Sequence, residues 1–152
     1  MSNRNYISRS PKETIAFAKK FAKGLRSGAV LEFSGDLGSG KTTFIKGLAL
    51  GLGLKDEDEV KSPTFVLMHI YPARIPIYHF DLYRLDTEKD IESVGLEGCL
   101  QDRSAITCVE WADKAPRFFP KDSLKINFQH AGRDCRKIVI EDGTKHEKRK
   151  KR

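Results

Sequence analysis

The residues from Gly35 to Thr42 read Gly-Asp-Leu-Gly-Ser-Gly-Lys-Thr and satisfy the phosphate-binding pattern G-x-x-x-x-G-K-[ST] in full. Glycines let the backbone of such a loop curl, so that successive N–H groups converge on phosphate oxygens at the positive end of the following helix. The lysine brings a point charge to the β- and γ-phosphates, and the threonine hydroxyl coordinates Mg²⁺. The sequence therefore predicts a nucleotide site formed by Gly38, Ser39, Gly40, Lys41, Thr42 and Thr43.

The segments on either side of this loop have the composition that a P-loop requires. Residues 29–33 form an apolar run of strand length, and residues 42–52 form a run of helical length. A strand before the loop and a helix after it favour a genuine P-loop over a chance glycine-rich turn. None of the three asparagines begins the N-K-x-D pattern that recognises guanine, so we expect the nucleotide to be ATP.

A P-loop enzyme also needs an acidic residue at the end of a neighbouring strand to hold Mg²⁺. Two acids meet this requirement, because Asp81 follows the apolar residues 77–80 and Glu110 follows residues 106–109. Open α/β sheets place their ligands at the carboxyl ends of the strands. Both carboxylates are therefore candidate catalytic residues, and the sequence does not determine which of them contacts the metal.

Several polar residues near these acids are open to two interpretations. We interpret His79 as a buried, hydrogen-bonded histidine rather than a catalytic one. Residues 62–65, Ser-Pro-Thr-Phe, lie between the P-loop helix and the strand before Asp81, where a nucleotide-sensing switch is expected. Thr64 would then reach the γ-phosphate or its metal; the alternative is a plain turn that starts a strand. Tyr83 and Arg84 form either a partner contact or an exposed surface pair.

The elements that must position these residues alternate along the chain. The residues from Ser10 to Glu13, Ser-Pro-Lys-Glu, have the layout of a capping box and begin a helix that Gly28 ends. Further strands are expected at residues 64–71, 75–80, 105–109, 124–128 and 137–140, with a helix at 90–101, an acidic surface loop at 56–59 and Gly132 in the last turn. This order predicts an α/β fold: a single P-loop NTPase-like domain over residues 1–144, with a mainly parallel sheet flanked by helices.

Composition excludes several other classes of protein. The 152 residues contain no run of 18 apolar residues, and the polar N-terminal segment lacks the apolar core of a secretion signal. The net charge of +7 is concentrated in residues 145–152, which hold six of the 28 basic residues and one of the 21 acidic ones. We expect this tail to be disordered, with either polyanion binding or solubility as its role. The three separated cysteines favour reduced thiols over a zinc site or a disulfide framework.

Taken together, these residues make the chain resemble the TsaE (YjeE) family of small bacterial ATPases. The P-loop segment is generic, but the three segments that follow it are specific to that family. The matching segments, in the same order and spacing, are GDLGSGKTTFIKGL at 35–48, VKSPTFVL at 60–67, IYHFDLYRL at 77–85 and VEW at 109–111.

The resemblance implies a cytoplasmic ATPase that uses Mg²⁺ and acts with the proteins TsaD and TsaB to make threonylcarbamoyladenosine in tRNAs reading ANN codons. It further implies that Thr42 and Glu110 hold Mg²⁺, that Asp81 lies in the catalytic site and that Trp111 stands beside it. The cap at Pro11 and the turn at Gly132 would approach the nucleotide. The basic tail departs from the family pattern, so any contact with tRNA through it is a separate expectation.

Two other functions remain open at the level of sequence. A small-molecule P-loop kinase would need an acceptor pocket and usually a basic lid, and no arginine-rich lid segment precedes the tail. A non-enzymatic, nucleotide-gated adaptor or tRNA-binding module would bind ATP without turning it over. Phosphate release with water as the acceptor separates the ATPase from both.

Overall fold

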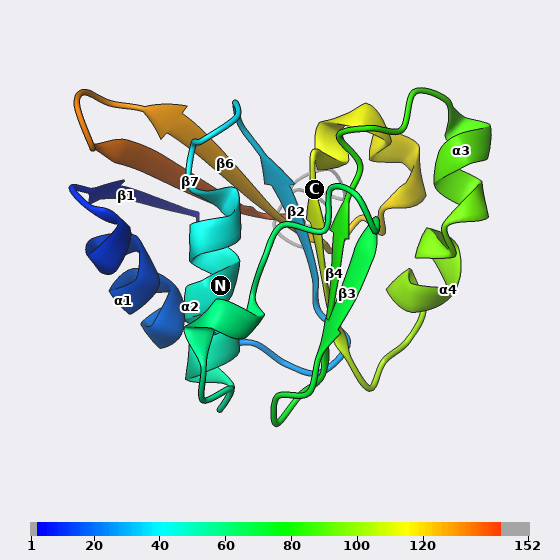
Figure 1. Ribbon diagram of the computed structural model, residues 1–152, viewed down its shortest axis with the longest axis horizontal. Coiled ribbons are helices and arrows are strands. Elements are labelled where there is room, and N and C mark those ends of the chain that lie inside the picture. Colours follow the sequence, from blue (N-terminus) through cyan, green and yellow to red (C-terminus); the bar gives the residue numbers. More distant parts are fainter. Residues whose placement is uncertain (1–2, 144–152) are drawn as a thin grey trace, which may run out of the picture.

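A computed structural model describes residues 3–143 of the chain. Its strands form one seven-stranded sheet in the order β1-β7-β6-β2-β5-β4-β3 (Figure 1). The central strands β6, β2, β5 and β4 run parallel, whereas β1, β7 and β3 pair antiparallel with their neighbours. The strands are β1 (Arg4–Ser8), β2 (Val30–Ser34), β3 (Met68–Tyr71), β4 (Ile77–Asp81), β5 (Ile106–Glu110), β6 (Leu124–His130) and β7 (Arg136–Asp142). The predicted α/β architecture is confirmed.

The helices cover different parts of the two faces of this sheet (Figure 1). One face packs against α1 and α2, and the other is covered at β4 and β5 by the short helical elements within residues 88–118. The helical elements are α1 (Pro11–Ala22), α2 (Lys41–Gly51), α3 (Glu88–Ser93), α4 (Leu96–Leu100) and the 3₁₀ turns η1 (Glu57–Glu59), η2 (Ala112–Lys114) and η3 (Pro116–Phe118). Among residues 3–143, no helix is both long enough and apolar enough to cross a bilayer.

The predicted capping box begins α1. Ser10 is the N-cap, and its hydroxyl accepts a hydrogen bond from the Glu13 backbone N–H at 3.1 Å, with Pro11 as the first helical residue. The Glu13 carboxylate accepts in turn from the Arg9 N–H at 2.7 Å. The helix-end N–H of Glu13 is thereby capped, and the Glu13 carboxylate binds the residue before the N-cap. The helix ends at Ala22, six residues before the expected stop at Gly28, because the chain turns at residues 23–25.

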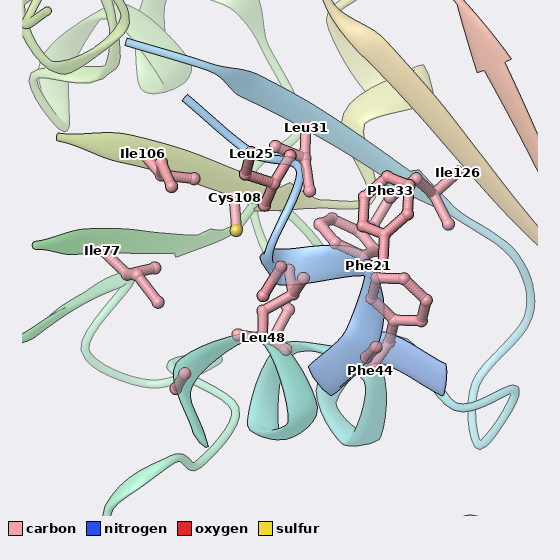
Figure 2. Packing of buried hydrophobic residues seen from close by; sticks show 14 of the residues in the cluster. Phe21, Leu25, Leu31, Phe33, Phe44, Leu48, Ile77, Ile106, Cys108 and Ile126 are labelled. Atoms are coloured by element: carbon pink, nitrogen blue, oxygen red, sulfur yellow. The ribbon is translucent and has the colours of Figure 1, made fainter. Parts of the chain in front are cut away.

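The larger apolar cluster lies between the sheet and the α1–α2 pair. Aromatic rings from α1, α2, β2 and β6 meet there, as Figure 2 shows for Phe21, Phe44 and Phe33, and the Phe33 and Phe44 rings lie 5.7 Å apart edge to face. A smaller cluster on the opposite face joins Phe80 and Val109 to the short helices. The first cluster fixes α2, and with it the P-loop, against the end of β2.

Two further expectations about local structure were wrong. The segment predicted as a strand over 64–71 is extended only from Met68, because residues 64–67 form a turn in which Leu67 adopts φ 73°. The helix expected at 90–101 is divided into α3 and α4 by Gly95, whose φ is 80°. The acidic surface loop predicted at 56–59 is exposed and contains the turn η1, whereas strand β1 was not predicted. The tail at 145–152 lies outside the described residues.

Candidate functional site

A cavity of about 330 Å³ opens at the carboxyl ends of the parallel strands. The P-loop forms its floor, and the start of α1, residues 62–64 and the ends of β4 and β5 form its walls. These segments lie far apart in sequence, and the sheet brings them to one edge, where open α/β folds place their ligands. The lining residues include Pro11, Ser39, Lys41, Thr42, Thr43, Thr64, Asp81, Tyr83, Glu110 and Trp111.

The loop before α2 has the backbone shape that binds phosphate. Gly35, Gly38 and Gly40 have φ of 138°, 71° and 109°, and a Cβ at Gly35 would lie 2.7 Å from the Phe128 carbonyl oxygen. Only glycine is free of strain there. Ser39 Oγ is buried and has no hydrogen-bond partner among the described atoms. An unpaired hydroxyl beside a helix N-terminus fits a phosphate oxygen as its missing partner.

The Lys41 ammonium is held inside the loop that precedes it. It donates to the Gly35 carbonyl and, at 3.2 Å, to the Asp36 carbonyl, and it lies 3.9 Å from the centre of the Trp111 ring. Burial lowers the pKa of Lys41, and the nearby carboxylates, led by Glu110, oppose that shift. The side chain is a cation in contact with the cavity, in the place where a nucleotide's terminal phosphates require one.

Thr42 and Glu110 meet at the cavity wall. The Thr42 hydroxyl is 3.1 Å from one carboxylate oxygen of Glu110 and donates to the other at 2.9 Å. The order of the strands explains why Glu110 is the acid that reaches the P-loop, since β5 lies beside β2 and β4 lies one strand further away. Within residues 3–143, no cluster of three His, Cys, Asp or Glu side chains forms a metal site on its own. One hydroxyl and one carboxylate nevertheless suit Mg²⁺, which takes its other ligands from phosphates and water.

Asp81 is held by the segment that sequence analysis identified as a candidate switch. The hydroxyls of Ser62 and Thr64 both lie 2.8 Å from its Oδ2 atom, and the Tyr83 backbone N–H donates to Oδ1 at 2.9 Å. The two acids lie opposite each other in the β4–β5 register, yet they have different partners. Glu110 is joined to the P-loop and Asp81 to residues 62–64.

His79 is fully buried and hydrogen-bonded, as predicted from the sequence. Its Nε2 atom lies 2.5 Å from Glu110 Oε2, and its Nδ1 atom lies 2.9 Å from the Tyr71 hydroxyl. The ring lies below the cavity and is not part of its lining.

Exposed aromatic side chains lie in or directly beside the segments that line the cavity. Phe65 is 85% exposed, and the centre of its ring lies 5.0 Å from the guanidinium carbon of Arg84. Neither Phe65 nor Arg84 is among the cavity-lining residues. Tyr83 is 42% exposed, and its ring centre lies 5.0 Å from that of Trp111. Trp111 itself has the left-handed φ of 59°, which turns the chain at the end of β5 and brings the indole over the P-loop lysine.

The β6–β7 turn also reaches the cavity, through residues that the sequence did not indicate. Gly132 is not among the lining residues, but Asp134 and Arg136 are. One Nη atom of Arg136 donates to the Gly38 carbonyl at 3.2 Å. Pro11 lines the cavity as expected, together with Thr14 from the next turn of α1. No local motif marks Arg136, because its place depends on the pairing of β6 with β7.

Comparison with known proteins agrees with this geometry. Residues 8–138 match the family model described as Threonylcarbamoyl adenosine biosynthesis protein TsaE. The chain belongs to the TsaE family. Among its relatives, the tRNA threonylcarbamoyladenosine biosynthesis protein TsaE of Bacillus subtilis strain 168 is 41% identical over 132 residues, which cover 86% of this chain and 80% of that protein.

Other TsaE relatives match over similar lengths. The protein of the same name from Treponema pallidum is 33% identical over 134 residues, covering 88% of this chain and 97% of the relative. The crystal structure of Bacillus subtilis YdiB superposes with a TM-score of 0.76 at 33% identity, covering 96% of this chain and 90% of that one. The resemblance to TsaE inferred from the sequence segments is thus confirmed. All three cysteines are free in the structure.

Proposed function

We propose that this chain is the ATP-hydrolysing component of the bacterial machinery that makes threonylcarbamoyladenosine in tRNAs reading ANN codons. The observation that carries the proposal is the contact between Thr42 and Glu110 beside Lys41, within a glycine-rich loop that opens into a cavity. A cation for the phosphates and an oxygen pair for a divalent metal are the two parts that phosphoryl transfer requires. The relatives carry the name of this tRNA modification.

Each side chain has a distinct role in this proposal. The P-loop amides and Ser39 bind the phosphates, and Lys41 leaves the Gly35 and Asp36 carbonyls to neutralise the γ-phosphate. Thr42 and Glu110 would hold Mg²⁺, which supplies charge neutralisation across the phosphate chain when bound. Asp81, at the far side of the cavity, orients the water that accepts the phosphoryl group, because a fixed acceptor is what aligns such a water.

The partners in this proposal are TsaD and TsaB, and the site of action is the cytoplasm. We assign the contact surface to Tyr83, which lines the cavity, and to the exposed side chains Phe65, Val66 and Arg84, which follow closely in sequence on the cavity-lining residues Thr64 and Asp81. Large exposed apolar side chains gathered at one place are typical of interaction sites. Because these residues adjoin Thr64 and Asp81, partner binding would act directly on the catalytic side chains.

The isolated chain should hydrolyse ATP slowly. An arginine supplied to a P-loop site in trans raises turnover by ~10³–10⁵-fold. Arg136 contacts the Gly38 carbonyl, and Arg84 stacks on Phe65, so each of these guanidinium groups already has a partner on its own chain. Assembly with TsaD–TsaB is therefore expected to supply the missing activation.

The deciding experiment measures phosphate release from ATP by the isolated chain and by its mixture with TsaD and TsaB, followed by a tRNA modification assay. Lys41→Ala is the inactive reference. Lys46→Ala, a lysine on the same helix that does not line the cavity, is the matched control. Stimulation of the wild type and of Lys46→Ala supports the proposal. Phosphate found on a small molecule would indicate a kinase instead, and tight ATP binding without any turnover would indicate an adaptor.

A further inference from the structure

A chain of hydrogen bonds, buried in its middle, runs from Lys61, directly before the candidate switch at residues 62–65, to the P-loop. The Tyr71 hydroxyl donates to the Lys61 carbonyl at 3.1 Å, and the same oxygen lies 2.9 Å from His79 Nδ1. The chain continues through the other ring nitrogen of His79 to Glu110, and from Glu110 to the Thr42 hydroxyl. Four side chains and one backbone carbonyl are thus connected in sequence.

The middle of this chain is inaccessible to water. Tyr71, His79 and Glu110 are 3%, 0% and 3% exposed. A buried polar group that loses its partner cannot turn to solvent instead, so each bond in the chain constrains the next side chain. The carboxylate of Glu110 is consequently fixed from both sides, by Thr42 in the cavity and by the His79 ring beneath it.

The same short segment also fixes the second acid. Residues 61–64 provide the Lys61 carbonyl for Tyr71 and the hydroxyls of Ser62 and Thr64 for Asp81. A displacement of this segment would therefore change the surroundings of both carboxylates together. Phe65, which follows it directly, is the most exposed of the large apolar side chains in the described part of the chain.

We propose that Tyr71 and His79 are positioning residues that hold the Glu110 carboxylate against Thr42 and join its position to residues 61–64. Neither side chain lines the cavity, so both act through Glu110. The inference rests on the proposed ATPase function. It adds a physical route by which a partner that contacts Phe65 would change the position of Glu110 at the P-loop. Buried side chains that are hydrogen-bonded to one another move together, whereas solvent-exposed side chains can move independently.

The test compares Tyr71→Phe with Tyr78→Phe. Both substitutions remove one phenol hydroxyl, but that of Tyr78 binds Asp102, away from the cavity. Loss of a residue that orients a metal ligand typically costs ~10–100-fold in activity. We expect Tyr71→Phe to lower kcat for ATP about tenfold with KM within about twofold of wild type, and Tyr78→Phe to leave both constants unchanged. Melting temperatures verify that the variants fold.

A double-mutant cycle and a spectroscopic readout distinguish positioning from a merely structural role. If Tyr71 acts through His79, then Tyr71→Phe in a His79→Gln background should have little further effect on kcat, because the effects of linked residues are not additive. In the free protein, the ¹⁵N signals of the His79 ring, assigned by their loss in His79→Gln, should shift in Tyr71→Phe and stay in place in Tyr78→Phe. These ring signals test the chain of contacts even if the protein proves not to hydrolyse ATP.

Three results would overturn the inference. The first is a kcat for Tyr71→Phe that equals that of Tyr78→Phe. The second is a loss of nucleotide affinity as large as the loss of turnover, which would mean that Tyr71 supports the whole site rather than Glu110. The third is full additivity of the two substitutions, which would show that the phenol does not act through the imidazole.

Discussion

Replacing Gly47 with alanine should force helices α1 and α2 apart. A Cβ at this position would lie 2.5 Å from the Ile15 carbonyl oxygen and 2.6 Å from the Ala18 Cβ. Both distances are far below van der Waals contact, and both neighbours belong to the rigid backbone region of α1. Gly51 lies one turn further along α2, and a Cβ added there would lie 2.6 Å from the Lys19 carbonyl oxygen. The helix pair therefore has no room in which to tilt, and one helix must shift as a body.

The magnitude follows from two opposing effects. Alanine is favoured over glycine within a helix by ~1 kcal/mol. Overpacking a tight core typically costs ~1–3 kcal/mol of stability. The added methyl group clashes both with a main-chain oxygen and with a Cβ, so we take the upper end of this range, ~3 kcal/mol. The free energy of unfolding should thus fall by ~2 kcal/mol, which corresponds to a melting temperature lower by ~4–8 °C in a domain of this size.

Urea unfolding and calorimetry measure this change, and a second glycine provides the control. Gly98 lies within helix α4, and among the described residues no atom outside its chain neighbours and its own helix backbone would lie within 4 Å of a Cβ there. Gly98→Ala should therefore raise the free energy of unfolding by ~0.5–1 kcal/mol, opposite in sign to Gly47→Ala. If both substitutions changed stability in the same direction, the close approach of α1 to α2 would not be the cause. Because α1 carries Pro11 and Thr14 of the cavity wall, Gly47→Ala should also weaken nucleotide binding.

Four further outcomes are expected. Lys41→Ala should weaken ATP binding by about 30-fold or more. The ion pair between Lys41 and the γ-phosphate is worth ~4 kcal/mol near the protein surface, and the lysine loses only part of this energy when it leaves its loop carbonyls. The change in affinity is measured by titration with ATP, followed by the fluorescence of Trp111, the only tryptophan in the sequence. Glu110→Ala should lower turnover about 100-fold and nucleotide affinity far less, and hydrolysis at the native rate would identify Glu110 as a bystander. Burial raises the pKa of Tyr71 to about 12, so the folded state holds the phenol proton more tightly than the unfolded state does. The contribution of this proton to stability is therefore complete below pH ~10 and is lost as the pH rises toward 12. Tyr71→Phe should reduce this dependence of the unfolding free energy on pH, as measured by unfolding curves in alkaline buffers. Deletion of residues 145–152 should leave ATP hydrolysis unchanged and weaken only salt-sensitive binding to RNA, and a large loss of turnover without RNA would contradict this.

Sequence alone predicts the P-loop and its flanking elements because phosphate chemistry restricts both residue type and spacing there. It cannot choose between Asp81 and Glu110, since each ends an apolar strand. The choice depends on the order of strands across the sheet, which places β5 beside β2 and is a property of the whole chain. The carboxylate nearer to Thr42 becomes evident only when that order is known.

The elements that sequence analysis missed lack an apolar pattern or depend on distant pairing. Strand β1 is a mostly polar edge strand whose partner is β7, at the other end of the chain. The turn at Leu67 could not be predicted, because its left-handed residue is a leucine rather than the glycine that usually occupies such positions. Arg136 reaches the cavity only because β7 pairs with β6, so no spacing along the sequence indicates its contact with Gly38.

The sheet separates two apolar clusters, and the cavity draws its side chains from both sides of that division. Helix α2, with Lys41 and Thr42, is packed into the larger cluster, whereas Trp111 packs against the smaller one. Such clusters are natural units of partial unfolding, and each can open at a lower cost than the whole domain. A nucleotide that contacts both would bind only when both are closed, and by mass action it would raise the cost of opening either. Amide hydrogen exchange should then slow on both faces of the sheet when ATP is added, including in strands that the nucleotide does not touch.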